Sequence, residues 1–482
     1  MSTRSSTAEA RSSRRWLALG VIAAAQFMVI MDTSIIGVAL PKMQDDLGFT
    51  PQGLSWVFNA YVVAFGGLLL LGGRLSDLFG ARRIFSLGWV ILAAGSLMAG
   101  FAGNVPVELA GRAVQGAGSA LIAPAALTLL FMTFGSSPKE LTKALALYGA
   151  AAPAGGTAGV FLGGVLTEYA SWPWVFFINV PLAVIVVAVT RSVMPAGVTR
   201  RGSLDITSAV IVTAGLTAVV FAVVRAPQAG WTSASTLAAG LGGLALLGLF
   251  VVMQARLREP LMRLGIFTAP NLAASNAAQF LLGAAWIPMF FFLNLYLQQV
   301  LGLGAFASGA ALLPLTVTIM VGMIGVAPRL IARFGPKAMT VAGLATLTGG
   351  LVWLSFIRPD GSFTFDVLPA SLLAAAGMAM AFIPSLGMAL SSVAPEEGGL
   401  AAGIVNTNYQ VGSALGLAAM TAVAAVFGAD QAGDASSLTD GFSAGLLAAA
   451  VIAAVGAVVA WAWLRTPQAA AETAPTDEHA AT

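Results

Sequence analysis

The sequence has no cysteine and a single histidine, His479, which lies in a polar stretch near the C-terminus. Without cysteine the chain forms no disulfide, holds no iron–sulfur cluster and offers no thiol nucleophile. One histidine outside the apolar segments leaves none within them for catalysis, for a proton relay or for a metal site. No Gly-x-x-x-x-Gly-Lys-Ser/Thr loop for a nucleotide phosphate is present either. We therefore expect no metal, no cofactor, no enzymatic activity and no direct use of ATP.

Charged residues are equally scarce. They make up 9% of the 482 residues, whereas 58% are hydrophobic, and the mean hydropathy is +0.89. Soluble domains carry about 25% charged residues. This chain has too few to cover the outside of a soluble globule, so we predict an all-α polytopic membrane protein that contacts the lipid bilayer. Nothing in its charge suggests binding to nucleic acid.

About fourteen apolar segments are long enough to cross a bilayer, which takes about 20 residues. Short loops with glycine, proline and charged residues separate them. The expected spans are 16–39, 53–73, 84–103, 107–131, 141–166, 174–194, 205–225, 234–254, 270–297, 307–328, 338–357, 366–390, 400–427 and 441–464. The polar tails, residues 1–15 and 466–482, are predicted to be disordered.

The positions of the 23 Lys and Arg residues predict the orientation. If the N-terminus is cytoplasmic, all of them fall in cytoplasmic segments except Lys42, Arg225, Arg358 and the intramembrane Arg112. Basic residues concentrate on the cytoplasmic side of membrane proteins. Both termini are therefore expected in the cytoplasm.

Two loops of the chain are similar. GRLSDLFGARR, from Gly73 to Arg83, and APRLIARFGPK, from Ala327 to Lys337, each place a basic turn with a glycine between two spans. We predict two six-helix halves, residues 16–200 and 263–465, with an inserted helix pair and its linkers at 201–262. Two related halves that face each other are typical of an alternating-access transporter.

One carboxylate lies inside the first span, Asp32 in the stretch MDTSIIGVALP. A carboxylate in the membrane costs about 2.5–3.5 kcal/mol on insertion scales and usually has a function. Arg112 is a second intramembrane charge, and Glu108 lies one turn before it on the same helix face. We predict that Asp32, Arg112 and Glu108 form a polar cluster, open to a central cavity, that couples protonation to conformation. A static ion pair between the first and fourth spans is the alternative.

These motifs resemble those of the major facilitator superfamily, specifically its fourteen-helix drug:proton antiporter branch. The loop motif is matched by Gly73, Asp77, Gly80, Arg82 and Arg83. MDTSIIGVALP is similar to the first-helix motif of this branch, and LAGRAVQGAGSA, from Leu109 to Ala120, to its fourth-helix motif. The resemblance covers about residues 16–465. It implies alternating access driven by protons, with Arg112 in proton handling.

The loop residues Gly73, Asp77, Gly80, Arg82 and Arg83 are expected to form a latch that holds the cytoplasmic face closed. A carboxylate can pair there with a basic residue or with a helix N-terminus. The alternative is an ordinary solvated loop. In the second loop Ala332 stands where the acidic residue would fall, so only the first loop is expected to be a complete latch.

A glycine pattern marks the fifth span. GGTAGVFLGG has Val160 where the antiporter motif normally has proline, which weakens the prediction of antiport. Gly155, Gly159 and Gly163 recur every four residues and are joined by Gly164. Such faces let helix backbones approach closely in membranes. We expect them to form a tight seam between the two halves, although packing alone explains them equally well.

The substrate cavity is expected between the first and fourth spans and their counterparts in the second half. Aromatic rings suit cations and flat molecules, and methionine adapts to varied shapes. For each candidate, ordinary packing between helices is the alternative. The candidates are Met28, Asn59, Tyr61, Gln115, Asn276, Gln279, Asn294, Tyr296, Asn406, Asn408, Tyr409 and Gln410. Few acids are expected in this cavity, which favours monovalent or neutral amphiphiles over divalent cations.

The sequence thus predicts a monomeric, proton-coupled exporter in the inner (cytoplasmic) cell membrane. Its partners would be protons and a small amphiphilic substrate such as a drug, a dye or an antibiotic. A proton-coupled uptake carrier for a metabolite, with the same fold, is the alternative, and the loss of proline at Val160 favours it.

Overall fold

The computed structural model describes residues 2–135, 137–195, 205–258, 260–261, 264–393, 398–430 and 434–465. This part of the chain is helical without strands, and 14 of its helical segments are long and apolar enough to cross a membrane. The predicted fold class and number of spans are therefore confirmed. The predicted tail 466–482 lies outside the described residues.

The first half of the bundle runs from α1 to α8, with a short turn, α2, between the first two spans. Its helices are α1 (Ser2–Leu47), α2 (Pro51–Leu54), α3 (Trp56–Phe79), α4 (Ala81–Gly100), α5 (Val105–Phe134), α6 (Pro138–Tyr169), α7 (Trp174–Phe177) and α8 (Asn179–Val193). The inserted pair is α9 (Ile206–Ala229) and α10 (Ala234–Arg256).

The second half begins after the 3₁₀ turn η1 (Leu264–Thr268) and contains several helices that are interrupted by π-helical turns. Its elements are α11 (Leu272–Leu295), η2 (Tyr296–Val300), α12 (Ala305–Ala311), α13 (Leu313–Val321), η3 (Gly322–Val326), α14 (Ala327–Phe334), α15 (Pro336–Leu354), η4 (Phe363–Val367), α16 (Leu368–Ser391), α17 (Gly398–Val426) and α18 (Ala435–Trp463).

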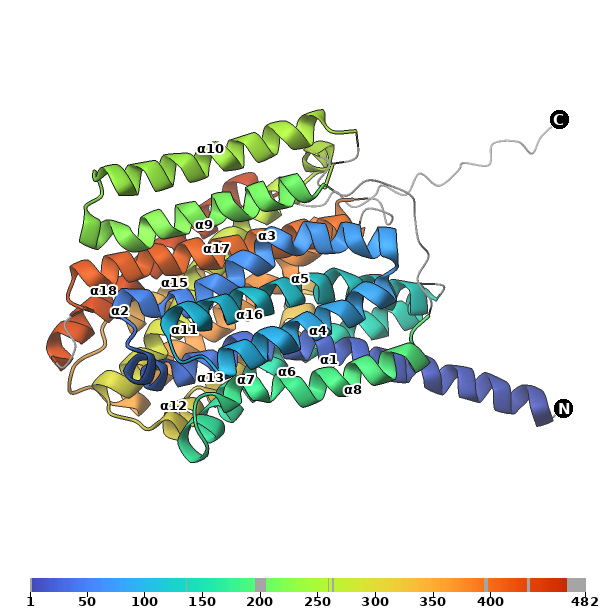
Figure 1. The fold of residues 1–482 in the computed structure, drawn as a ribbon, viewed down its shortest axis with the longest axis horizontal. Helices are drawn as coiled ribbons and strands as arrows, with labels where there is room; N and C mark the ends of the chain where they lie inside the picture. Colours follow the sequence, from blue (N-terminus) through green and yellow to red (C-terminus); the bar gives the residue numbers. More distant parts are fainter. Residues whose placement is uncertain are drawn as a thin grey trace.

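The N-terminus differs from the prediction, because α1 is helical from Ser2 where we expected a disordered tail up to residue 15. Figure 1 shows the start of α1 projecting beyond the other helices. Extending an existing helix needs no new nucleation, and this stretch contains no glycine or proline to stop it.

The inserted pair lies at one edge of the bundle, where α10 is the outermost helix (Figure 1). The inner helix of the pair, α9, packs against α3 of the first half and α17 of the second. The insertion therefore adds to the lateral surface, and α9 covers the edge where α3 and α17 of the two halves meet.

We call the end of the bundle that holds Arg14 and Arg15 the N-terminal end, and the end where α1 stops at Leu47 the opposite end. Basic side chains tie helices together at the N-terminal end. Arg15 pairs with Glu140 at 2.8 Å, and Arg14 donates to the carbonyl oxygen of Ser192.

The two similar loops have the same backbone. Gly80 ends α3 and begins α4 with φ of 90°, and Gly335 joins α14 to α15 with φ of 81°. Residues with a side chain rarely adopt this conformation, so glycine is required at both turns. The two loops that are similar in sequence thus share a turn at a glycine with positive φ.

The glycine face of α6 packs against α1. A Cβ atom on Gly159 or Gly163 would lie 2.7 Å from a backbone oxygen of α1, and one on Gly155 would lie closer still. The oxygens that the three glycines face belong, in order, to Phe27, Met31 and Ile35. The predicted seam therefore lies within the first half, since α1 and α6 both belong to it.

Gly164 is the member of the set that faces the second half. A Cβ atom there would lie 2.9 Å from the backbone of Ala305 and Phe306 in α12. Its position one residue beyond Gly163 turns it towards a different face of α6, because successive residues on a helix are rotated by about 100°. Of the four glycines, only Gly164 lies between the two halves, where the seam was predicted.

Hydrogen bonds also join the halves at the opposite end. Gln298 donates to the carbonyl oxygen of Val38 at 3.2 Å, and Gln299 donates to the side chain of Gln44 at 3.2 Å. The carboxylate of Glu168 accepts a bond from the backbone nitrogen of Ala305 at 3.1 Å. This end of the bundle is therefore held closed in the structure.

The α1–α6 seam leads to a first prediction. Gly155→Ala should lower the free energy of unfolding by about 1–3 kcal/mol, because its methyl group would press on a helix backbone that cannot move locally. The midpoint of thermal unfolding in detergent measures this change.

Gly149→Ala is the matched control. It lies on the same helix, and nothing is within 4 Å of the position that its added methyl group would take. Equal midpoints of thermal unfolding for the two variants would show that α1 and α6 can accommodate an added methyl group and do not form a tight seam.

Candidate proton-coupling and substrate site

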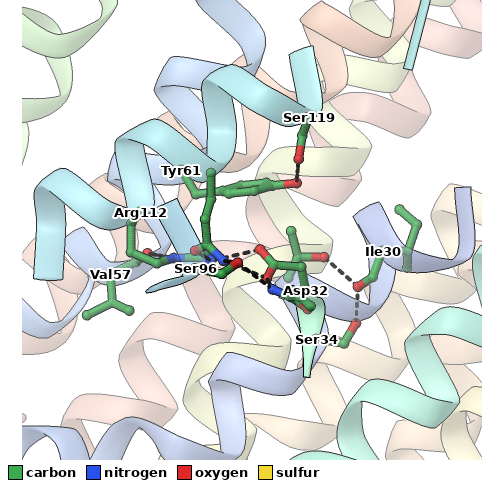
Figure 2. Close-up of polar contacts among 11 residues, drawn as sticks. Ile30, Asp32, Ser34, Val57, Tyr61, Ser96, Arg112 and Ser119 are labelled. Atoms are coloured by element: carbon green, nitrogen blue, oxygen red, sulfur yellow. Dashed lines mark hydrogen bonds and ion pairs between the residues drawn. The ribbon is translucent and has the colours of Figure 1, made fainter. Parts of the chain in front are cut away.

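Asp32 lies at the centre of a buried polar cluster in the first half (Figure 2). Its side chain is fully buried, and it pairs with Arg112 of α5 through Nη1 and Oδ2, which are 2.8 Å apart. Its other oxygen accepts bonds from the amide nitrogens of Gln115 at 3.1 Å and Asn179 at 2.6 Å. One ionic and two neutral donors therefore stabilise the charged carboxylate.

Arg112 is also fully buried and makes further contacts. Its Nε donates to the carbonyl oxygen of Val57 at 2.9 Å, and its Nη1 donates to Oε1 of Gln115 at 2.7 Å. The guanidinium lies 4.6 Å from the centre of the Tyr61 ring and 5.9 Å from that of Phe176. Two aromatic faces thus cover the cation, and cation–π attraction adds to the ion pair.

The predicted contact between Asp32 and Arg112 is confirmed, but the predicted opening to a central cavity is absent from this conformation. Both side chains have 0% exposure. The rings of Tyr61 and Phe176 cover Arg112, and the side chains of Arg112, Gln115 and Asn179 surround Asp32. Access to Asp32 requires these helices to move.

Two members of the cluster were not predicted. Ser96 of α4 accepts bonds from Gln115 at 2.7 Å and from Asn179 at 3.0 Å, and so joins the two amides to each other. Asn179 begins α8 and is a lone amide within an apolar run. The sequence alone could therefore have identified it as a candidate. Ser96 offers no such signal, because serine is common in membrane helices.

Glu108 is fully buried on α5, but it makes no hydrogen bond with the described residues. Nη2 of Arg112 likewise has no partner among them. The cluster therefore contains one ion pair, and beside it lies one buried acid without a hydrogen-bond partner among the described residues.

The expected latch is only partly described. Arg82 donates to the carbonyl oxygen of Met194 at 3.3 Å, which ties α4 to the end of α8 within the first half. Arg83 is exposed, and Gly80 forms the turn. Gly73 lies near Pro124 of α5, since a Cβ atom added to it would be 3.8 Å from that ring. The side chain of Asp77 lies outside the described residues, so the latch stays a prediction.

The first-half cavity candidates are all inside the helix bundle. Tyr61 and Gln115 belong to the Asp32 cluster, and the Tyr61 hydroxyl donates to Ser119 at 2.8 Å. Met28 is fully buried. Asn59 is fully buried too, and neither atom of its amide has a partner in the described part of the chain.

Several second-half candidates form a polar region between α11, α16 and α17. Asn408 donates to Asn276 at 2.8 Å, and Gln279 donates to Ser385 at 2.9 Å. The ring of Tyr409 is half-buried and lies edge-on to Phe382, with 5.7 Å between ring centres. The half-buried Asn406 lies on the same helix as Tyr409, and Gln410 packs against Gly66 of α3. Contact of these residues with a substrate stays a prediction.

Asn294 and Tyr296 are placed differently from the other candidates. The Tyr296 hydroxyl donates to the carbonyl oxygen of Arg358 at 2.7 Å, and its ring is fully buried. It therefore anchors the loop between α15 and η4. Asn294 accepts a bond from Ser308 at 3.4 Å and lies against Gly37 of α1, where the two halves meet. Both residues lie near the opposite end, where Tyr296 holds a loop and Asn294 lies at the contact between the halves.

The sequence matches the family described as Major Facilitator Superfamily over residues 22–417. The chain belongs to this superfamily. The resemblance seen in its motifs is therefore confirmed, and it is a multi-pass membrane protein of a transporter family.

Two relatives extend over most of the chain. The cephamycin export protein CmcT of Amycolatopsis lactamdurans is 38% identical over 417 residues, which are 86% of this chain and 86% of the relative. The puromycin resistance protein pur8 of Streptomyces alboniger is 35% identical over 471 residues, 95% of this chain and 93% of the relative.

Solved structures share the fold. The human organic anion transporter MFSD10 has a TM-score of 0.64 at 16% identity, with 92% of this chain and 99% of that one covered. The nucleoside transporter NupG, solved as a point mutant, has a TM-score of 0.64 at 14% identity, with 93% and 99% covered.

The ion pair leads to a second prediction, tested by a double-mutant cycle. Arg112→Met should lower the free energy of unfolding by about 3–5 kcal/mol, because it leaves Asp32 buried without its cation. Adding Asp32→Asn should recover part of this loss, since no buried charge remains. Chemical denaturation of the four proteins measures the coupling energy. Strict additivity of the two substitutions would contradict a stabilising ion pair.

Proposed function

We propose that this protein is a proton-coupled exporter, an antiporter that moves hydrophobic or amphiphilic compounds out of the cell by alternating access. The observation that carries the proposal is the buried pair of Asp32 and Arg112 in a superfamily of transporters. A buried ionisable group is expensive in a membrane protein, and such groups mark ion and proton pathways. Relatives named for cephamycin export and puromycin resistance support the substrate class.

The geometry suggests how a proton changes the cluster. Asp32 is held by Arg112, Gln115 and Asn179 in this conformation. A proton on Asp32 removes the ionic attraction and leaves Arg112 with an uncompensated buried charge. Glu108, one turn away on α5, would then become the new partner of Arg112. Protonation of one acid thereby changes which helices Arg112 holds together.

This exchange would couple protons to the two halves, because α1 carries both Asp32 and contacts to the second half. Val38, six residues after Asp32, accepts the bond from Gln298 of η2. Movement of α1 away from Arg112 would strain that contact at the opposite end. Release of the ion pair and release of the closed end are therefore linked through one helix.

The orientation follows from charge. Arg14, Arg15 and Arg82 lie at the N-terminal end of the bundle, where their hydrogen-bond partners gather. Basic residues favour the cytoplasmic side, so we place this end and both termini in the cytoplasm and the opposite end outside. The inner (cytoplasmic) membrane and a monomeric state belong to the same proposal.

An uptake carrier of the same fold is the second candidate, favoured by Val160. This valine is buried, and its carbonyl oxygen lies 2.6 Å from the position that a Cβ on Gly309 would take. The proline of the antiporter motif is thus replaced by a residue in close contact with the second half.

The third prediction tests coupling. In sealed proteoliposomes with an imposed pH gradient, the wild-type protein should move an amphiphilic dye against its gradient as protons flow the other way. Asp32→Asn should abolish this transport, because an amide cannot exchange a proton at physiological pH. Dye fluorescence measures the rate.

Asp440→Asn is the control for this experiment, because Asp440 is an exposed acid on α18. Transport by Asp32→Asn at the wild-type rate would show that Asp32 has a structural role, and Glu108 would become the candidate for proton coupling. A wild-type protein that ignores the gradient, or that moves the compound in the same direction as protons, would favour the uptake carrier.

The fourth prediction tests orientation, and the absence of cysteine makes it direct. Thr232→Cys, in the exposed loop between α9 and α10, should react with a membrane-impermeant maleimide in intact cells. Leu257→Cys, just after the other end of α10, should react only after the cells are permeabilised. The reverse pattern would invert the proposed topology.

A further inference from the structure

A cavity of about 330 Å³ lies at the opposite end of the bundle, between the two halves. The first half contributes the end of α1 with Asp45 and the turn α2 with Pro51. The second half contributes α11, α17 and α18. No residue of the Asp32 cluster lines it, so it is a separate feature of the molecule. Its volume is near the lower limit of small-molecule sites, which is roughly 300 Å³.

Aromatic rings form part of the wall. The ring centres of Phe291 and Phe292 are 5.3 Å apart, and those of Phe292 and Phe442 are 5.9 Å apart. All three rings are buried and line the cavity. The face of an aromatic ring attracts cations, and quaternary ammonium groups in particular.

Polar groups at the same cavity are left without partners. Thr421 of α17 is buried and lines the cavity, but its hydroxyl has no hydrogen-bond partner among the described residues. Asp45 is exposed at the rim, and no basic side chain in the described part of the chain pairs with it. A buried hydroxyl without a partner is costly, and a ligand in the cavity would relieve that cost.

We propose that this cavity is a second ligand site, which takes a small aromatic cation such as a benzylammonium compound. The phenylalanine rings hold its apolar body and its charge, and Asp45 complements the charge from the rim. The amides of Gln44 and Gln299, which bond to each other across the two halves, also line the cavity. A bound ligand therefore contacts both halves and holds this end closed. That this end faces the outside rests on the proposed function.

The absence of cysteine allows a direct test on purified protein in detergent, where both ends are accessible. Ala435 lines the cavity and is exposed, whereas its neighbour Ser436 is exposed and does not line it. In Ala435→Cys, benzyltrimethylammonium at about ten times its dissociation constant should slow maleimide labelling about tenfold. Labelling of Ser436→Cys should not change. Adding Asp45→Asn to Ala435→Cys should raise the half-protecting concentration about two- to fivefold, as for a partly exposed ion pair.

Each other outcome overturns a defined part of the proposal. No protection of Ala435→Cys, or equal protection of Ser436→Cys, means that the cavity is not the binding site. Protection that Asp45→Asn leaves unchanged means that the site does not recognise charge through this acid. Protection should persist when Asp32→Asn is added, although proton-driven transport should not. A failure of this inference can therefore be told apart from a failure of the proposed function.

Discussion

Burial of the Asp32 charge is the constraint on which the rest of the first half depends. A carboxylate in an apolar interior needs a cation and hydrogen-bond donors to stay charged. Here α5 supplies Arg112 and Gln115, and α8 supplies Asn179. Helix α4 contributes Ser96, which accepts bonds from both amides and fixes their orientation. Four helices are thus held around one charge, so a change in that charge acts on all four.

Close helix packing makes this arrangement possible. The contact between α4 and α5 is so tight that a Cβ atom on Gly95 would lie 2.6 Å from the backbone nitrogen of Gln115, and one on Gly111 would lie 2.7 Å from that of Ala99. Ser96 follows Gly95 directly, so this contact brings its hydroxyl within reach of the Gln115 amide. The glycines of α6 similarly bring that helix against the part of α1 that carries Asp32. Small residues here determine the geometry of a polar site.

One helix, α1, runs from the buried cluster to the opposite end of the bundle. Helix α1 passes from Arg15 at the N-terminal end, through Asp32, to Val38 and Gln44, which bond to the second half. The cavity lined by Asp45 lies at the end of this same helix. A ligand there and a proton at Asp32 would therefore act on the same helix from different positions. If both proposals hold, α1 would carry communication between the cavity and the Asp32 cluster.

The sequence by itself determined the fold class, the fourteen spans, the repeat of the two loops and the family. These depend on local properties: run length, composition and motifs that need no knowledge of contacts. It also singled out Asp32 and Arg112, because a charge in an apolar run is visible without a structure. Only the tertiary structure decided that Ser96 and Asn179 complete the cluster, that Glu108 stays unpaired among the described residues, that three glycines of α6 pack within one half, and that Tyr296 anchors a loop. Those outcomes depend on which helix faces lie opposite each other, and ordinary residues such as serine and glycine do not reveal their neighbours.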